Sequence, residues 1–310
     1  MSSFNRIAVY GHRGWGSSRI VKALIASGAP IRVLTRPGSD VSSLPDDVEK
    51  VEVDVNDEER LVGALKDIDI VISLVGHEGV QRQHGFVKAF PKTNVKLFSP
   101  SDLAARYDEQ GMRIAVNKNK DEVERAAKAA GIPTTVVLIG NFAEFALNTL
   151  GMGVDISGNR LINSANSAET KVNLCTRDYV AAAYVSIFTK TPIAQIQNRA
   201  IALTELSPTG GDVANALKER NGETPQISNH SLEKINGEIE DGLASGSLFT
   251  LSWYCRKILG TGQQAQMVGT DLWEVEGYKK ATLKDLIVDG KLEYYREMLP
   301  QVREYFDSCF

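Results

Sequence analysis

The sequence lacks the long hydrophobic runs, the cysteine pairs and the strong net charge that mark several protein classes. Because no apolar run reaches 18 residues, no transmembrane helix is expected. The N-terminus enters an apolar strand too soon to hold a secretory signal. A net charge of −4 over 310 residues gives no general reason to bind nucleic acid or anionic membrane.

Cysteine and histidine are also too sparse and too scattered to form a metal site. The three cysteines, Cys175, Cys255 and Cys309, are far apart and odd in number, and the four histidines show no HExxH spacing. Free thiols are typical of a reducing compartment, so we expect a cytoplasmic protein. We predict no metal.

The first 140 residues alternate between apolar runs and helical patterns. Continuous apolar runs of this kind are typical of parallel strands that are buried on both faces. We predict strands at 6–11, 31–36, 48–55, 69–76, 95–100 and 134–140, and helices at 15–26, 57–68 and 119–131. The pattern predicts an α/β fold with a Rossmann-type, doubly wound parallel sheet.

The pattern loosens after residue 150. We expect strands at 171–176 and 198–205, a helix at 177–190, broken helices over 209–259, and a helical end over 281–306. We therefore predict an NAD(P)-binding Rossmann domain over residues 1–150. Residues 151–310 would mainly form a smaller C-terminal α/β substrate-binding lobe, interleaved with the sheet.

The stretch "GHRGWGS", residues 11–17, joins the first predicted strand to the first helix. Such a turn is the usual phosphate site of a parallel sheet, because the helix N-terminus offers free N–H groups. Gly11 would make the tight turn, Gly14 would let the backbone approach a pyrophosphate, and Gly16 and Ser17 are small enough for close packing. Trp15 either covers the pyrophosphate or packs on the helix.

An arginine stands where NAD sites carry an acid. The second strand ends in "VLTRPGS", so Arg36 occupies the position of the acid that bonds the ribose 2′-hydroxyl. A guanidinium can clamp a 2′-phosphate, and Arg13 of the glycine turn could hold its other side. The alternative is two solvated surface arginines, and we favour NADPH as the cofactor.

Four segments carry a family resemblance: "GHRGWGSSRIV" from Gly11, "DIVISLVGHEGVQRQ" from Asp69, "NVKLFSPSDLA" from Asn94, and "KDEVERAAKAAGIPTTVVLIGNFAEF" from Lys120. In them the chain resembles the NmrA-like, isoflavone-reductase-like branch of the atypical short-chain dehydrogenase/reductases. The third segment departs from the family pattern, with Asp102 in place of a glutamate and Ala104 in place of a glycine.

The resemblance implies roles for residues at matching positions. Lys120 falls on the family's reductase lysine, near the nicotinamide. The other implied cofactor contacts follow three predicted strands: Val75 and Gly76 under the cofactor, Ser99, Pro100 and Ser101 round the nicotinamide ribose, and Asn141 and Phe142 beside the nicotinamide. His77 and Phe145 are candidates for substrate contact, and Phe145 could equally belong to the core.

The residues themselves also favour Lys120 as the catalytic group. A cation can donate a proton or stabilise the oxyanion that develops when a substrate accepts hydride. Lys120 shares a helical face with Val123 and Ala127, so it can point inward, although an exposed lysine on a charged face is the alternative. Val116 stands four residues earlier, so a Tyr-x-x-x-Lys pair is absent here.

These observations predict an NADPH-dependent reductase that acts on a small aromatic or secondary-metabolite substrate. Two alternatives stay open. The chain could bind the dinucleotide as a redox-sensing regulator without turnover, or it could use the pocket for a redox-neutral isomerisation or dehydration. Nothing in the C-terminal half identifies the substrate.

Overall fold

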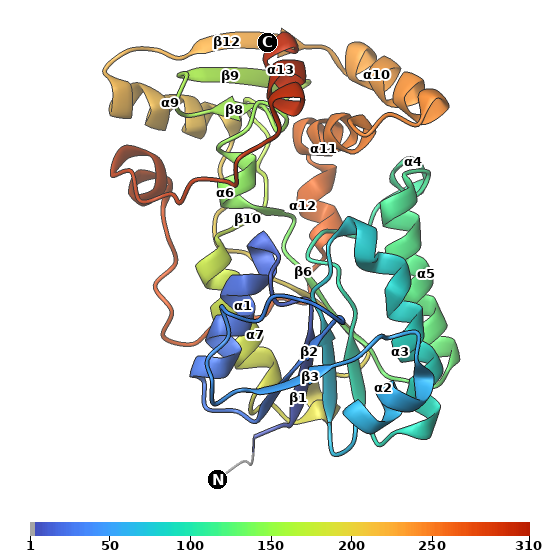
Figure 1. The fold of residues 1–310 in the computed structure, drawn as a ribbon. Helices are drawn as coiled ribbons and strands as arrows, with labels where there is room; N and C mark the ends of the chain where they lie inside the picture. The colour runs from blue at the N-terminus through green and yellow to red at the C-terminus, as the bar shows by residue number, and fades with distance from the viewer. Residues whose placement is uncertain (1–3) are drawn as a thin grey trace.

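A parallel five-stranded sheet forms the centre of the computed structural model, which describes residues 4–310 (Figure 1). The strand order is β3-β2-β1-β4-β5. A parallel bridge from Phe98 to Thr134 carries the sheet on to β6, which pairs with β11. The strands are β1 (Ile7–Tyr10), β2 (Ile31–Thr35), β3 (Glu49–Glu52), β4 (Ile70–Ser73), β5 (Leu97–Ser99), β6 (Thr135–Leu138) and β11 (Arg199–Ala202).

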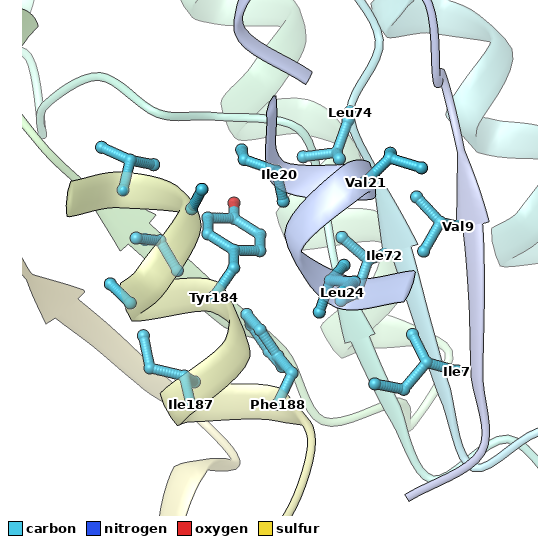
Figure 2. Close-up of a cluster of buried hydrophobic side chains, with 14 of the residues drawn as sticks. Ile7, Val9, Ile20, Val21, Leu24, Ile72, Leu74, Tyr184, Ile187 and Phe188 are labelled. Carbon is cyan, nitrogen blue, oxygen red and sulfur yellow. The ribbon is translucent and has the colours of Figure 1, made fainter. Parts of the chain in front are cut away.

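Helices cover both faces of this sheet, because alternate side chains of each buried strand point to opposite sides. Ile7 and Val9 of β1 pack in one core with helices α1 (Trp15–Ala26) and α7 (Arg177–Phe188), as Figure 2 shows. Ala8 and Tyr10 pack in a second core on the other face. That core is closed by α2 (Glu58–Ala64), α3 (His84–Ala89) and α5 (Ala115–Ala129). The predicted doubly wound α/β fold is confirmed.

Tyr184 lies at the centre of the contact between α1 and α7. Figure 2 shows its ring between Ile20 of α1 and Phe188 of its own helix. Burial raises the pKa of Tyr184 well above its usual value. A neutral phenol in an apolar layer holds α1 firmly against the sheet, and α1 carries the glycine turn at its N-terminus.

A smaller lobe lies at the end of the molecule opposite the N-terminus (Figure 1). Its three-stranded sheet has the order β12-β9-β8 and was not expected from the sequence. Helices α9, α10, α11 and α13 surround it. The elements are β8 (Val154–Asp155), β9 (Arg160–Ser164), β12 (Gln226–His230), α9 (Gly210–Asn221), α10 (Leu232–Ser245), α11 (Thr250–Thr261) and α13 (Pro300–Ser308).

The predicted helix over 281–306 is wrong for most of its length. The structure has a short helix, η3 (Lys284–Val288), then an irregular stretch, residues 289–299, and then α13. Pro300 disfavours helical geometry at the residue before it, Leu299. Helix α13 therefore begins at Pro300. We call residues 289–299 the C-terminal segment.

The remaining elements are short: η1 (His77–Gln83), η2 (Phe90–Lys92), α4 (Glu109–Met112), β7 (Asn141–Phe142), α6 (Ala143–Ala146), β10 (Leu174–Cys175), α8 (Ile193–Ile196) and α12 (Gln263–Val268). Within residues 4–310 no helix combines the length and apolar character that crossing a membrane requires. The same residues contain no group of three or more histidine, cysteine, aspartate or glutamate side chains placed to hold a metal.

Gly11 brings two backbone segments close together at the sheet edge. Its φ is +100°, and a Cβ there would lie 2.7 Å from the carbonyl carbon and oxygen of Leu74 and 3.0 Å from the nitrogen of Val75. Both the backbone conformation and the crowding therefore require glycine.

Replacing Gly11 with alanine should lower the free energy of unfolding by roughly 3 kcal/mol or more, because strain and steric overlap add. Gly28→Ala is the matched control: its φ is +75°, with nothing within 4 Å of the added methyl. It should lose only about 1 kcal/mol. Urea unfolding of the three proteins measures both values, and equal losses would contradict the steric account.

Candidate functional site

The glycine turn leaves the N-terminus of α1 open to an anion. Gly14 is the N-cap residue, it supplies no side-chain cap, and the first turn of the helix holds no acid. The first intrahelical bond runs from the Ser18 N–H to the Gly14 carbonyl at 2.9 Å. The N–H groups of the preceding residues are therefore available to a phosphate.

Small residues in this turn make room for neighbours. The Ser17 hydroxyl donates to the Gly14 carbonyl at 3.2 Å and so closes the turn on itself. A Cβ on Gly16 would lie 3.3 Å from the ring of Phe142. Gly16 thus brings β7 close to α1, which the sequence alone did not reveal.

The loops that carry Arg13 and Arg36 are joined. His12 is buried, and its Nε2 lies 3.1 Å from the Asp40 carbonyl oxygen. Arg13 and Arg36 are both exposed, and neither forms an ion pair with any residue in 4–310. Two carboxylates approach this edge. Glu52 of β3 accepts a hydrogen bond from the Gly38 N–H at 3.0 Å, and the pKa of Asp40 is lowered by hydrogen bonds from Ser42 and by the charge of Arg13.

Arg82 of η1 adds a third positive charge near this edge. Arg36 and Arg82 both lie close enough to the Tyr10 hydroxyl to oppose the rise that burial causes in its pKa. No sequence pattern points to Arg82, because it falls in a helical turn that follows a different strand. Three arginines therefore come from three loops at one sheet edge.

The ends of β4 and β5 are locked together beside the glycine turn. The Ser101 hydroxyl donates to the Val75 carbonyl at 2.7 Å, and the Ser101 N–H donates to Gln83 Oε1 at 2.8 Å. Gly76, the N-cap of η1, has open space around its Cα. Pro100 and Ser99 are buried at the end of β5, and the Ser99 hydroxyl lies toward Tyr184 in the core.

Lys120 points inward from α5. Its side chain is 13% exposed, whereas that of Lys118, two residues earlier, is 61% exposed. Its Nζ donates to the Asp102 carbonyl oxygen at 2.8 Å and lies 3.5 Å from Asp102 Oδ1. Burial raises the pKa of Asp102, and the ammonium of Lys120 opposes that rise. A cavity of about 70 Å³ lies beside Lys120.

The loop that follows β5 is fixed to α5 at a second point. Arg106 makes a two-pronged ion pair with Glu124, at 2.6 and 3.0 Å, one helical turn beyond Lys120. Glu124 is buried, and the guanidinium of Arg106 helps to hold its pKa below the usual value against the effect of burial. This ion pair holds the loop against α5 and so fixes the position of Asp102 relative to Lys120.

His77 lies at the start of η1 with one face exposed. Partial desolvation of the ring, the charge of Lys120 and the charge of Arg296 all lower its pKa. The lowered pKa favours the neutral imidazole, and the effect of the Lys120 charge shows that His77 lies near that ammonium.

Trp15 is held by residues that lie far from it along the chain. Its ring makes edge contacts with Phe142, at 5.3 Å between centroids, and with Tyr295 of the C-terminal segment, at 4.9 Å. The guanidinium of Arg177 lies 4.5 Å from the Trp15 ring centroid. Phe145 packs on Tyr295 at 4.9 Å. The four rings form one aromatic cluster, which consists of Trp15, Phe142, Phe145 and Tyr295.

Asn141 is oriented by a buried amide. Gln264 of α12 donates to Asn141 Oδ1 at 3.2 Å and to the Asn173 carbonyl oxygen at 2.7 Å. Its own Oε1 accepts from the Asn173 N–H at 2.8 Å. With Oδ1 occupied in this way, Asn141 keeps its Nδ2 donor free.

Glu144 is a buried carboxyl beneath the aromatic cluster. Its Oε1 accepts from the Arg177 N–H at 2.9 Å, and its Oε2 has no hydrogen-bond partner among residues 4–310. Burial raises its pKa to about 7, against the opposing effect of the Arg177 N–H. Its sequence neighbours, "NFAEF", gave no sign of this environment.

The structure thus brings most of the predicted residues to one sheet edge, and it adds five that the sequence analysis missed. These are Arg82, Glu144, Arg177, Gln264 and Tyr295. Trp253 and Tyr254 of α11 are core residues. The Thr176 hydroxyl oxygen caps α7 by accepting from the Tyr179 N–H.

The residues present fit a dinucleotide that carries an extra phosphate. The uncapped N-terminus of α1 suits a pyrophosphate. Gly11 has no side chain, so it places no bulk beside that N-terminus. The unpaired Arg13 and Arg36 supply charge where a 2′-phosphate would lie.

A sequence model of the NmrA-like family matches residues 3–251. Phenylcoumaran benzylic ether reductase Pyrc5 of Pyrus communis is 32% identical over 163 residues, which cover 48% of this chain and 53% of that protein. The chain thus aligns with about half the length of that relative. Isoflavone reductase of Cicer arietinum is 27% identical and aligns over 97% of this chain and 99% of its own length.

The fold matches solved structures along nearly the whole chain. Leucoanthocyanidin reductase of Vitis vinifera, solved as a binary complex with NADPH, superposes with a TM-score of 0.73 and 16% identity. The match covers 93% of this chain and 100% of that one. The Rossmann-type architecture expected from the resemblance is confirmed.

Glu144→Gln should make stability less dependent on pH. The unfolded carboxyl titrates near 4.5 and the folded one near 7, so wild type loses stability as the pH rises through this window. The variant should equal wild type below pH 4.5 and exceed it by up to about 3 kcal/mol above pH 7. Urea unfolding at pH 4.5, 6 and 8 measures the difference.

Glu240→Gln is the control of opposite sign. The side chain of Arg113 holds the pKa of Glu240 below its usual value, so its carboxylate stabilises the fold as the pH rises. That variant should therefore fall below wild type at pH 8. A Glu144→Gln protein that tracked wild type at every pH would contradict the buried, protonated state.

Proposed function

Because the chain belongs to the NmrA-like family, we propose that it is an NADPH-dependent reductase of a small aromatic substrate. The observation that carries the proposal is the inward ammonium of Lys120, which lies at the same sheet edge as an open glycine turn. Two hydrogen bonds link them along this edge: Lys120 to Asp102, and Ser101 to Val75, whose backbone passes beside Gly11.

Positive charge near the carboxyl end of β2 supports NADPH over NADH. Arg13 and Arg36 have no carboxylate partner among the described side chains, so their donors are free for a 2′-phosphate. The uncapped N-terminus of α1 would hold the pyrophosphate. Asn141 would offer Nδ2 to the cofactor, with its orientation set by Gln264.

Lys120 would handle the proton of the reaction. When bound, NADPH supplies the hydride that reduces the substrate. Lys120 Nζ, held by the Asp102 carbonyl oxygen, would donate a proton to a carbonyl or phenolic oxygen of the substrate or stabilise its negative charge. Neutral His77 would lie beside that oxygen as a hydrogen-bond partner.

The aromatic cluster favours an aromatic substrate. Phe142, Phe145 and Tyr295 present ring edges and faces on one side of the site, and such rings pack well on other rings. The relatives that match the chain are named for reduction of an isoflavone and of a phenylcoumaran benzylic ether. We extend this class, a plant-type phenolic, to the present chain as part of the proposal.

Lys120→Met should lower kcat by about 10²-fold or more while NADPH affinity changes by only a few fold, because the proton donor is lost and the binding groups remain. Turnover is followed as loss of nicotinamide absorbance with a panel of benzylic ethers, isoflavones and enones. Lys118→Met, at an exposed position of the same helix, is the matched control and should keep wild-type turnover.

Each competing function gives a distinct result in this assay. Tight NADPH binding without oxidation across the panel, in wild type and Lys120→Met alike, would contradict the reductase proposal and indicate a regulator. Conversion of substrate without a gain of two hydrogens in product mass would indicate a redox-neutral isomerisation or dehydration.

Arg36→Gln should weaken NADPH binding by roughly 10- to 100-fold and leave NADH binding nearly unchanged, because only NADPH carries the phosphate. Titration calorimetry with both nucleotides gives the ratio. Arg125→Gln removes an arginine that pairs with Asp121 on α5, and it should change neither affinity. Equal affinity of wild type for the two nucleotides would rule out the clamp.

A further inference from the structure

A second cavity, of about 60 Å³, lies inside the C-terminal lobe among β8, β9, α9 and α11. Its walls are mostly apolar and include Leu147, Val172, Val213 and Leu259. It is not fully enclosed. None of the residues assigned above to NADPH or substrate lines it, so it is a separate feature of the molecule.

Arg256 of α11 gives this apolar cavity one charged end. The side chain is only 2% exposed, yet it has no carboxylate partner within ion-pair distance among residues 4–310. Its Nε donates to the Ser164 hydroxyl at 3.0 Å, and its Nη2 lies 2.6 Å from His230 Nδ1. The charge of Glu238 acts on Arg256 only from beyond ion-pair distance. A buried guanidinium without a direct anionic partner is costly, and structures rarely retain one without a reason.

His230 cannot neutralise this charge. A second cation, Lys234, places its Nζ 3.2 Å from His230 Nε2. A neutral imidazole has one acceptor nitrogen, so it can satisfy only one of the two cations. Burial and the charges of Arg256 and Lys234 lower the pKa of His230 to about 4, which keeps it neutral. Burial lowers the pKa of Arg256 to about 10, so Arg256 stays charged at neutral pH.

Close packing of α11 on β9 fixes the charged end in place. A Cβ on Gly260 would lie 2.0 Å from the Ser164 carbonyl oxygen, so the helix touches the strand directly there. One turn earlier, Arg256 is thereby held against the Ser164 side chain. The Trp253 ring, 4.5 Å from the guanidinium, covers it from another side. The guanidinium is preorganised.

We propose that this cavity binds a short aliphatic monocarboxylate, with the carboxylate on Arg256 and the Ser164 hydroxyl and the alkyl chain against the apolar wall. A carboxylate matches the guanidinium fork and supplies the missing negative charge. The volume, less than half that of a cavity that holds benzene, limits the chain to about two to four carbons.

Titration calorimetry of the full chain with sodium acetate, propionate and butyrate at constant ionic strength tests the proposal. We expect one site with a Kd of order millimolar, since a ligand of so few atoms gains little more. Acetamide and propionamide have nearly the same shape without the charge, and they should bind at least tenfold more weakly. Trp253 fluorescence should change with the same Kd.

Two variants test the site independently, one by its charge and one by its volume. Arg256→Gln removes the charge, and Val213→Phe fills the cavity from α9 and leaves Arg256 in place. Each should weaken carboxylate binding at least tenfold, and Arg125→Gln on α5 should not. If Arg256→Gln fails to fold, Val213→Phe decides alone.

The proposal is overturned if wild type binds none of the carboxylates, if the amides bind equally well, or if Val213→Phe retains wild-type affinity. These outcomes do not depend on the reductase proposal, because no nucleotide is present in the titration. A carboxylate that bound and left NADPH affinity unchanged would support a site of its own.

Discussion

The close crossing at Gly11 is the constraint on which the rest of the site depends. The chain leaves β1 within contact distance of the backbone that leaves β4, and this leaves space only for hydrogen on Gly11. The crossing sets the start of α1, and the core around Tyr184 holds the helix there. Ser101 then bonds to Val75 at the same point, so three strand ends share one fixed edge.

The central sheet could be predicted because its strands are continuous apolar runs, buried on both faces, in which local pattern and burial agree. The small sheet could not, because β12, "QISNH", is polar and leaves Ile227 exposed, so no alternation marks it. The C-terminal segment has a helical composition, "KLEYYREML", but the contacts of Glu293 and Tyr295 and the proline at 300 decide its path. Tertiary contacts overrode propensity there.

The residues of the candidate site also divide into those that could be predicted from the sequence and those that could not. Gly11, Arg36 and Lys120 could be proposed from the sequence, because each stands at a strand end or on a helix face that the pattern locates. Gln264 and Tyr295 could not, since each reaches the site from more than 100 residues away along the chain. Buried environments are also invisible in sequence: "NFAEF" gives no indication that Glu144 carries a pKa of about 7.

Trp15 connects the start of α1 to the second half of the chain. Arg177 donates to the Trp15 carbonyl oxygen at 2.5 Å, lies over its ring, and pairs with Glu293 at 3.0 Å. Arg19 pairs with the same glutamate. Exposed ion pairs contribute little singly, but Arg177 is largely buried and shared among three partners. The start of α1 and the aromatic cluster are therefore held by one set of contacts. The C-terminal segment supplies part of these contacts, so it helps to position the site.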